Sequence, residues 1–136
     1  MKRLITQKLV KWKESNDRKP LILRGARQVG KTYIVSEFGN EYYENMVYFN
    51  FDNDSELENV FEYTKDPERI LNQLRIISGK EISKGKTLIF FDEIQECQNA
   101  LNSLKYFNEN ANEYHIIAAG SLLGINLVKH HFLLEK

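Results

Sequence analysis

A glycine-rich segment near the N-terminus has the residue types that bind phosphate groups. Residues 25–32, GARQVGKT, match the pattern G-x-x-x-x-G-K-[ST] at every fixed position. Glycines let a backbone wrap so that successive N–H groups point at phosphate oxygens, and a helix that begins there adds partial positive charge. Lys31 would reach the outer phosphates, and the Thr32 hydroxyl could bind Mg²⁺. The segment therefore predicts a nucleotide-phosphate site.

A second candidate motif is an apolar run that ends in two carboxylates, LIFFDE at residues 88–93. In open α/β folds the carboxyl ends of strands form the ligand-binding edge. At that edge Asp92 would hold the Mg²⁺ shell and Glu93 would polarise an attacking water. A base for water favours hydrolysis over phosphate transfer to a small molecule.

A third motif, IIAAGS at residues 116–121, follows the same scheme. Gly120 would let the chain turn after a strand, and the Ser121 hydroxyl would lie near the terminal phosphate as a sensor. Serine after glycine is also common in ordinary turns, so the turn reading stays open beside the sensor reading.

Together these motifs give a set of candidate site residues. The predicted catalytic residues are Lys31, Glu93 and Ser121, and the predicted metal ligands are Thr32 and Asp92. The predicted nucleotide-binding residues are consecutive in sequence: Gly25, Ala26, Arg27, Gln28, Val29, Gly30, Lys31, Thr32 and Tyr33. For Tyr33 two positions are open, packing on the sheet or packing on the base of the nucleotide.

The elements that would position these residues alternate along the chain. Short apolar runs predict strands, and stretches with helical periodicity predict helices between them. This alternation predicts a three-layer α/β/α fold with a mostly parallel sheet. The expected strands are 21–23, 47–51, 87–91 and 115–119, and the expected helices are 2–15, 31–38, 67–78 and 100–110. Gly39 is expected to end the second helix, and Ser55 with Glu58 to form a capping box.

Length and composition limit the class of protein. The chain has 136 residues and no formal net charge, which fits one domain without a global attraction to nucleic acid or membrane. Seven cations in residues 1–19 could contact nucleic acid, although a solvated helix face is the favoured interpretation. A single cysteine, Cys97, excludes an intrachain disulfide and fits a reducing compartment. No apolar run is long enough for a signal peptide or a membrane span, so we expect a cytoplasmic protein.

Several chemistry-bearing residues are interpreted as structural. The three histidines lack the spacing of a metal site, and Cys97 is expected to be a buried small residue. Aromatic residues flank the second strand without interleaved cations, so we expect packing rather than a nucleic-acid platform. These aromatic residues are Tyr42, Tyr43, Tyr48, Phe49 and Phe51.

Three segments in order, RKPLILRGARQVGKT, LIFFDEIQEC and EYHIIAAGSLLG, resemble the bacterial and archaeal AAA-type P-loop ATPases in which a nuclease-like domain follows the ATPase. The resemblance covers residues 4–127. It implies ATP and Mg²⁺ as cofactors, an ASCE-type core with the first strand between the fourth and a fifth, and the site roles given above. Arg27 matches the family pattern, but no role follows from that match.

The resemblance breaks off at the end of the chain. Proteins of this type continue into a fifth strand, a helical lid and a C-terminal domain, whereas this sequence ends at Lys136. We therefore expect a truncated core: an N-terminal helix (1–19), a P-loop core (20–128) and a tail (129–136). Strand 21–23 would then be an exposed edge, which predicts self-association or a missing segment. No arginine finger can be assigned.

Three functions follow from these observations. The favoured one is Mg²⁺-dependent ATP hydrolysis, weak or absent for this chain alone. A non-hydrolysing nucleotide-binding or interaction module is the alternative. A P-loop small-molecule kinase is less favoured, because the acidic stretch 52–68 offers neither an acceptor pocket nor lid arginines.

Overall fold

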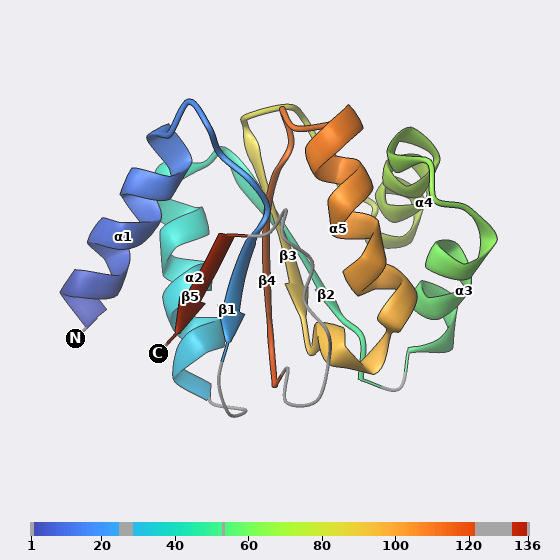
Figure 1. The fold of residues 1–136 in the computed structure, drawn as a ribbon, viewed down its shortest axis with the longest axis horizontal. Helices are drawn as coiled ribbons and strands as arrows, with labels where there is room; N and C mark the ends of the chain where they lie inside the picture. Colours follow the sequence, from blue (N-terminus) through green and yellow to red (C-terminus); the bar gives the residue numbers. More distant parts are fainter. Residues whose placement is uncertain (1, 25–28, 53, 122–131, 136) are drawn as a thin grey trace.

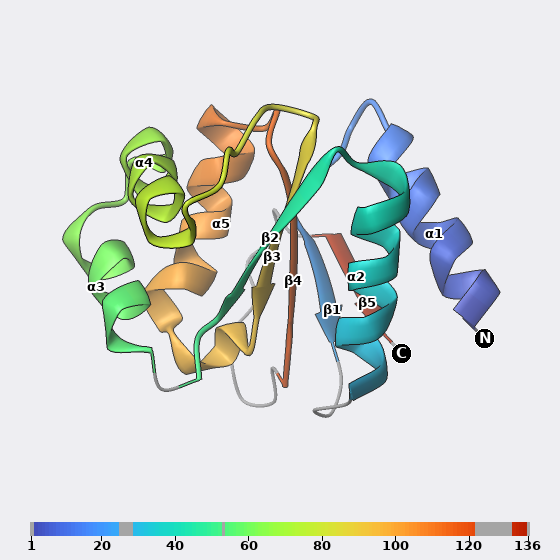
Figure 2. The ribbon, with the colours of Figure 1, turned by 180° about the vertical axis from the view of Figure 1, so that it is seen from behind.

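A computed structural model describes residues 2–24, 29–52, 54–121 and 132–135. The described strands form one parallel sheet with helices on both faces (Figure 1; Figure 2). This arrangement confirms the predicted α/β fold class of a P-loop core.

The sheet contains β1 (Leu21–Arg24), β2 (Asn45–Asn50), β3 (Thr87–Asp92), β4 (His115–Gly120) and β5 (Phe132–Glu135). The strands are parallel neighbours in the order β2-β3-β4-β1-β5. The first strand therefore lies between the fourth and the fifth, as the resemblance implied.

The prediction that the sheet ends after its fourth strand is wrong. β5 pairs with β1 from Leu21↔Phe132 to Arg24↔Glu135, inside the segment expected to be a tail. The physical reason is the short apolar run FLL at residues 132–134, which suits a parallel strand despite its length. Because β1 is paired on both sides, it is not an edge, and the self-association predicted from that edge loses its basis.

Two layers of helices enclose the sheet. α1 (Lys2–Glu14) and α2 (Val29–Tyr42) cover one face, and α3 (Ser55–Tyr63), α4 (Pro67–Ser78) and α5 (Gln98–Asn110) cover the other (Figure 1). A short 3₁₀ helix, η1 (Ile94–Glu96), links β3 to α5. Among the described helices, none is both long and apolar enough to cross a membrane.

Each face of the sheet has its own hydrophobic core, and successive residues of β1 pack into one core and then the other. Leu21 and Leu23 pack with α1 and α2, whereas Ile22 packs in the core beneath α3, α4 and α5. This alternation follows from the period of two along a strand. Trp12 is 2% exposed and its Nε1 donates to the Lys19 carbonyl at 2.6 Å, so it ties α1 to the segment that leads into β1. Cys97 is buried, as predicted.

Two local predictions need correction. α2 continues past Gly39 to Tyr42, because Gly39 serves close packing: a Cβ there would lie 2.7 Å from Met46 Sδ. The N-cap of α3 is Asp54, whose side chain accepts from Leu57 N, while Ser55 is the first helical residue. Asp66 caps α4, and its Oδ1 accepts from the Glu68 backbone N–H.

A buried histidine lies at the opposite end of the sheet from the phosphate motifs, at the start of β4. His115 Nδ1 is 2.7 Å from the Tyr43 hydroxyl, and Trp12 packs edge-on against the imidazole. Burial, and then the nearby cations Arg18 and Lys13, lower the pKa of His115 to about 4. The neutral imidazole is therefore the form that the fold favours.

We expect this histidine to make stability depend on pH. Its folded pKa lies below the ordinary value of 6.5, so its full contribution is present above about pH 6.5 and is lost as the pH falls toward 4. The loss should be on the order of 2–3 kcal/mol of unfolding free energy. Urea unfolding between pH 7.5 and 4 measures it. In His115→Asn, which keeps a polar group near Nδ1, this part of the slope should vanish; an unchanged slope would contradict the assignment.

Candidate phosphate-binding site

The three predicted motifs meet at one edge of the sheet. β1 ends at Arg24, β3 at Asp92 and β4 at Gly120, and Arg24 is in register with Gly120. The first turn of α2 lies at the same edge, where the strand arrows end (Figure 1). The predicted loop residues Gly25, Ala26, Arg27 and Gln28, and the side chain of Val29, lie outside the described residues.

Thr32 and Asp92, sixty residues apart in sequence, are in direct contact. Thr32 Oγ1 donates to Asp92 Oδ2 at 3.0 Å, and the other carboxylate oxygen, Oδ1, accepts from the Glu93 backbone N–H at 2.9 Å. A hydroxyl beside a carboxylate is a donor set that fits Mg²⁺, which takes one or two protein oxygens when it also binds nucleotide phosphates. The structure thus brings the two predicted metal ligands together.

Lys31 lies in the first turn of α2 and is only 7% exposed. A buried ammonium is costly unless an anionic or hydrogen-bonding group accompanies it. Its place at a helix N-terminus, one residue before Thr32, is where an anionic ligand would also meet the positive end of the helix dipole. Gly30, immediately before it, is exposed.

Tyr33 does not pack on the sheet. The side chain is 54% exposed, and its hydroxyl donates to Glu37 Oε2 at 2.6 Å, one helical turn along α2. Of the two positions left open by the sequence, packing on the sheet is therefore excluded. An exposed ring beside the first turn of α2 stays compatible with packing on a nucleotide base.

Glu93 has an unusual backbone conformation. Its φ of 54° and ψ of 43° are left-handed, and among the described residues it is the one non-glycine with positive φ. Such a conformation costs of order 1–3 kcal/mol and is concentrated at functional sites. The side chain is 8% exposed, and Oε1 accepts from Gln95 Nε2 at 2.8 Å. The surrounding loop thus holds the carboxylate at the end of β3.

Ser121 follows Gly120 at the end of β4 and is partly exposed. Its neighbours across the sheet are the ends of β1 and β3, so it lies on the same edge as Thr32 and Asp92. Ser121 thus lies at the carboxyl edge of the sheet, while its place beside the terminal phosphate and its role as a sensor stay predictions.

Comparison with known proteins shows the family of this chain. A model of the family described as "AAA domain" matches residues 17–131. This chain belongs to the AAA domain family. Family membership carries nucleotide-binding, ATPase-type function at the family level. The finer resemblance, to members with a nuclease-like C-terminal domain, stays a prediction.

Structural comparison finds fourteen matching chains, among them PCH-2 of C. elegans. The match has 17% sequence identity and a TM-score of 0.49, and it covers 99% of this chain and 42% of the PCH-2 chain. This AAA domain thus spans less than half of that protein's length. No curated protein sequence matches.

Two polar residues of this AAA domain were not among the predicted site residues. Tyr48, expected to serve packing, does pack on Phe90, but its hydroxyl also donates to Asp92 Oδ2 at 2.7 Å. Gln95, which no sequence motif singled out, holds Glu93 through the bond described above. The sequence held only weak indications that these two residues belong to the site. Tyr48 lies on the same face of β2 as Asn50, at the end of the strand, and Gln95 lies two residues after Glu93.

Gly120 lies at the end of β4, where the segment that follows β3 approaches so closely that a side chain would not fit. A Cβ at this position would overlap with Gln95 Oε1 and would lie 3.2 Å from the Ile94 backbone nitrogen. We expect Gly120→Ala to lower the unfolding free energy by about 1–3 kcal/mol, the usual cost of overpacking, measured by urea denaturation. Combining it with Gln95→Ala should restore part of the loss, because that removes the side chain in the way. Wild-type stability of the single variant would contradict the packing.

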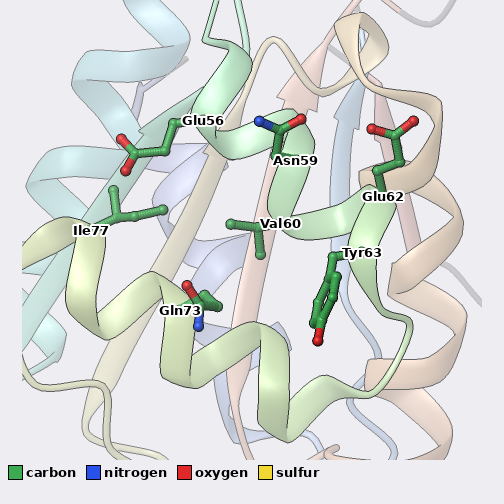
Figure 3. Close-up of a pocket in the computed structure, with 7 residues that line it drawn as sticks. All are labelled: Glu56, Asn59, Val60, Glu62, Tyr63, Gln73 and Ile77. Atoms are coloured by element: carbon green, nitrogen blue, oxygen red, sulfur yellow. The ribbon is translucent and has the colours of Figure 1, made fainter.

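A separate surface groove lies between α3 and α4, with a volume of about 690 Å³. Figure 3 shows side chains from the two helices around it, with Val60 in its middle. Its residues are Glu56, Asn59, Val60, Glu62, Tyr63, Gln73 and Ile77. None of them belongs to the predicted site, so the groove is distinct from the edge that gathers the phosphate motifs.

Proposed function

We propose that this AAA domain binds Mg·ATP at the carboxyl edge of its sheet and hydrolyses it with water as the acceptor. The observation that carries the proposal is the 3.0 Å hydrogen bond between Thr32 Oγ1 and Asp92 Oδ2. It joins the start of α2 to the end of β3, the two places where a phosphate loop and a carboxylate must meet.

Each residue has a chemical task in this proposal. Lys31 and the first backbone N–H groups of α2 stabilise the negative charge of the phosphates. Thr32 Oγ1 and Asp92 Oδ2 would hold Mg²⁺, whose chemistry is to neutralise charge on the phosphate oxygens. Glu93 orients water and accepts its proton, and Ser121 donates a hydrogen bond to the terminal phosphate.

One contact favours a second candidate, a module that binds nucleotide without turnover. Gln95 Nε2 donates to Glu93 Oε1 at 2.8 Å and so engages the carboxylate that must act on water. If that bond persisted with nucleotide bound, the base would be held by the protein instead. The two candidates predict the same binding and differ in phosphate release.

The experiment that separates them is phosphate release from Mg·ATP over a series of protein concentrations, with ATP binding measured on the same samples. Release that disappears in Glu93→Gln supports hydrolysis. Binding without release supports the second candidate. Family membership also makes self-association an expectation, and release that rises faster than linearly with concentration would support it.

The compartment and the remaining partners are proposed from composition. A single cysteine fits a reducing compartment, so we propose the cytoplasm. The basic residues of α1 are proposed to form a solvated face rather than a nucleic-acid contact, because the chain as a whole carries no net charge.

A further inference from the structure

Asp92 receives hydrogen bonds on both oxygens, from three separate donors. Oδ1 accepts from Glu93 N, whereas Oδ2 accepts from Thr32 Oγ1 at 3.0 Å and from the Tyr48 hydroxyl at 2.7 Å. The Tyr48 bond is the shorter of the two at Oδ2, the oxygen that also contacts Thr32 on α2. The edge strand β2 thus takes part in the site through one side chain.

Tyr48 is held in place by two neighbours. It is in register with Phe90 on β3, and the two rings pack at 63° with centroids 5.3 Å apart. Asn50, two residues further along the same strand, donates from Nδ2 to the Tyr48 hydroxyl oxygen at 3.3 Å. Because that oxygen accepts from Asn50, its own proton is directed to Asp92.

The hydroxyl is the one group of Tyr48 that contacts Asp92, since the 2.7 Å bond runs from its O–H to Oδ2. A phenylalanine could keep the ring contact with Phe90 but could not make this bond.

We propose that Tyr48 is a positioning residue that fixes the Asp92 carboxylate for Mg²⁺. The inference rests on the proposed Mg·ATP site and extends it to β2. The terminal torsion of an aspartate is broad, so a carboxylate held from one side alone would sample several orientations. Donors from α2 and from β2 together leave Oδ2 facing Thr32 Oγ1, where a cation would need both oxygens.

The test is Tyr48→Phe, with ATP binding measured by calorimetry over a range of Mg²⁺ concentrations and again with EDTA. Loss of such a supporting bond commonly weakens metal binding about 10–100-fold. We expect the Mg²⁺ concentration for half-maximal ATP binding to rise at least about tenfold, with binding in EDTA unchanged. Phosphate release, where present, should recover at saturating Mg²⁺.

Tyr63→Phe is the matched control, because it removes the same hydroxyl from an exposed side chain on α3. It should behave as the wild type. An unchanged Mg²⁺ requirement in Tyr48→Phe would overturn the inference and leave the proposed site intact. Equal weakening with and without Mg²⁺ would also overturn it, since that indicates a role in folding or packing. A wild-type chain without Mg²⁺-dependent ATP binding would overturn the proposed function together with this inference.

Discussion

Replacing Lys31 with alanine should reduce ATP affinity at least about 100-fold, because the ammonium is the one side-chain cation in the first turn of α2 among the described residues. Hydrogen bonds to charged groups contribute about 1.5–3 kcal/mol each, and an ammonium can make more than one to a triphosphate. Calorimetry or displacement of a fluorescent ATP analogue measures the loss.

The lysine is buried, so its removal could also affect packing. Lys31→Met keeps most of the aliphatic stem without the charge and should lose ATP affinity to a similar extent while unfolding at a wild-type urea concentration. Lys8→Ala, an exposed lysine on α1, is the control that should bind normally. Near-wild-type affinity in Lys31→Met would contradict a phosphate contact.

Replacing Glu93 with glutamine should abolish phosphate release while leaving ATP affinity within about threefold of wild type. Glutamine has the same shape but cannot accept a proton, and a positioned general base contributes about 10²–10⁴-fold to rate. Single-turnover phosphate release, at protein in excess over ATP, measures the chemical step separately from product release.

The segment that follows β3 provides a matched control for Glu93→Gln. Glu96 lies three residues on, is exposed, and also accepts from Gln95 Nε2, at 3.4 Å. Glu96→Gln makes the same chemical change next to the same amide and should release phosphate at the wild-type rate. Equal loss in both variants would indicate a general effect of loop charge and would remove Glu93 from its role as base.

Much of the site could be predicted from the sequence, since its residues lie in local patterns. A glycine pattern with Lys31 and Thr32, and an apolar run that ends in Asp92, each specify a loop at a strand end. Parallel pairing then brings those ends to one edge, and the contact of Thr32 with Asp92 follows from topology.

What the sequence did not reveal depends on contacts between distant segments. From the sequence alone, Tyr48 is an aromatic residue of a strand with no sign of a polar role. Only the register of β2 on β3 places its hydroxyl next to Asp92. No local pattern in the sequence indicates the left-handed backbone of Glu93 or the hydrogen bond that its side chain accepts from Gln95. β5 was missed because four residues carry too little periodicity to distinguish a strand from a tail.

The most direct test of the central claim is an amide-resolved NMR titration of the isotopically labelled chain with Mg²⁺ and a non-hydrolysable ATP analogue. We predict that the largest shifts fall on the edge defined by Lys31, Thr32, Asp92 and Ser121, and that Lys31→Met removes them. Shifts confined to the α3–α4 groove around Val60, or no shifts at saturating nucleotide, would contradict a Mg·ATP site at this edge.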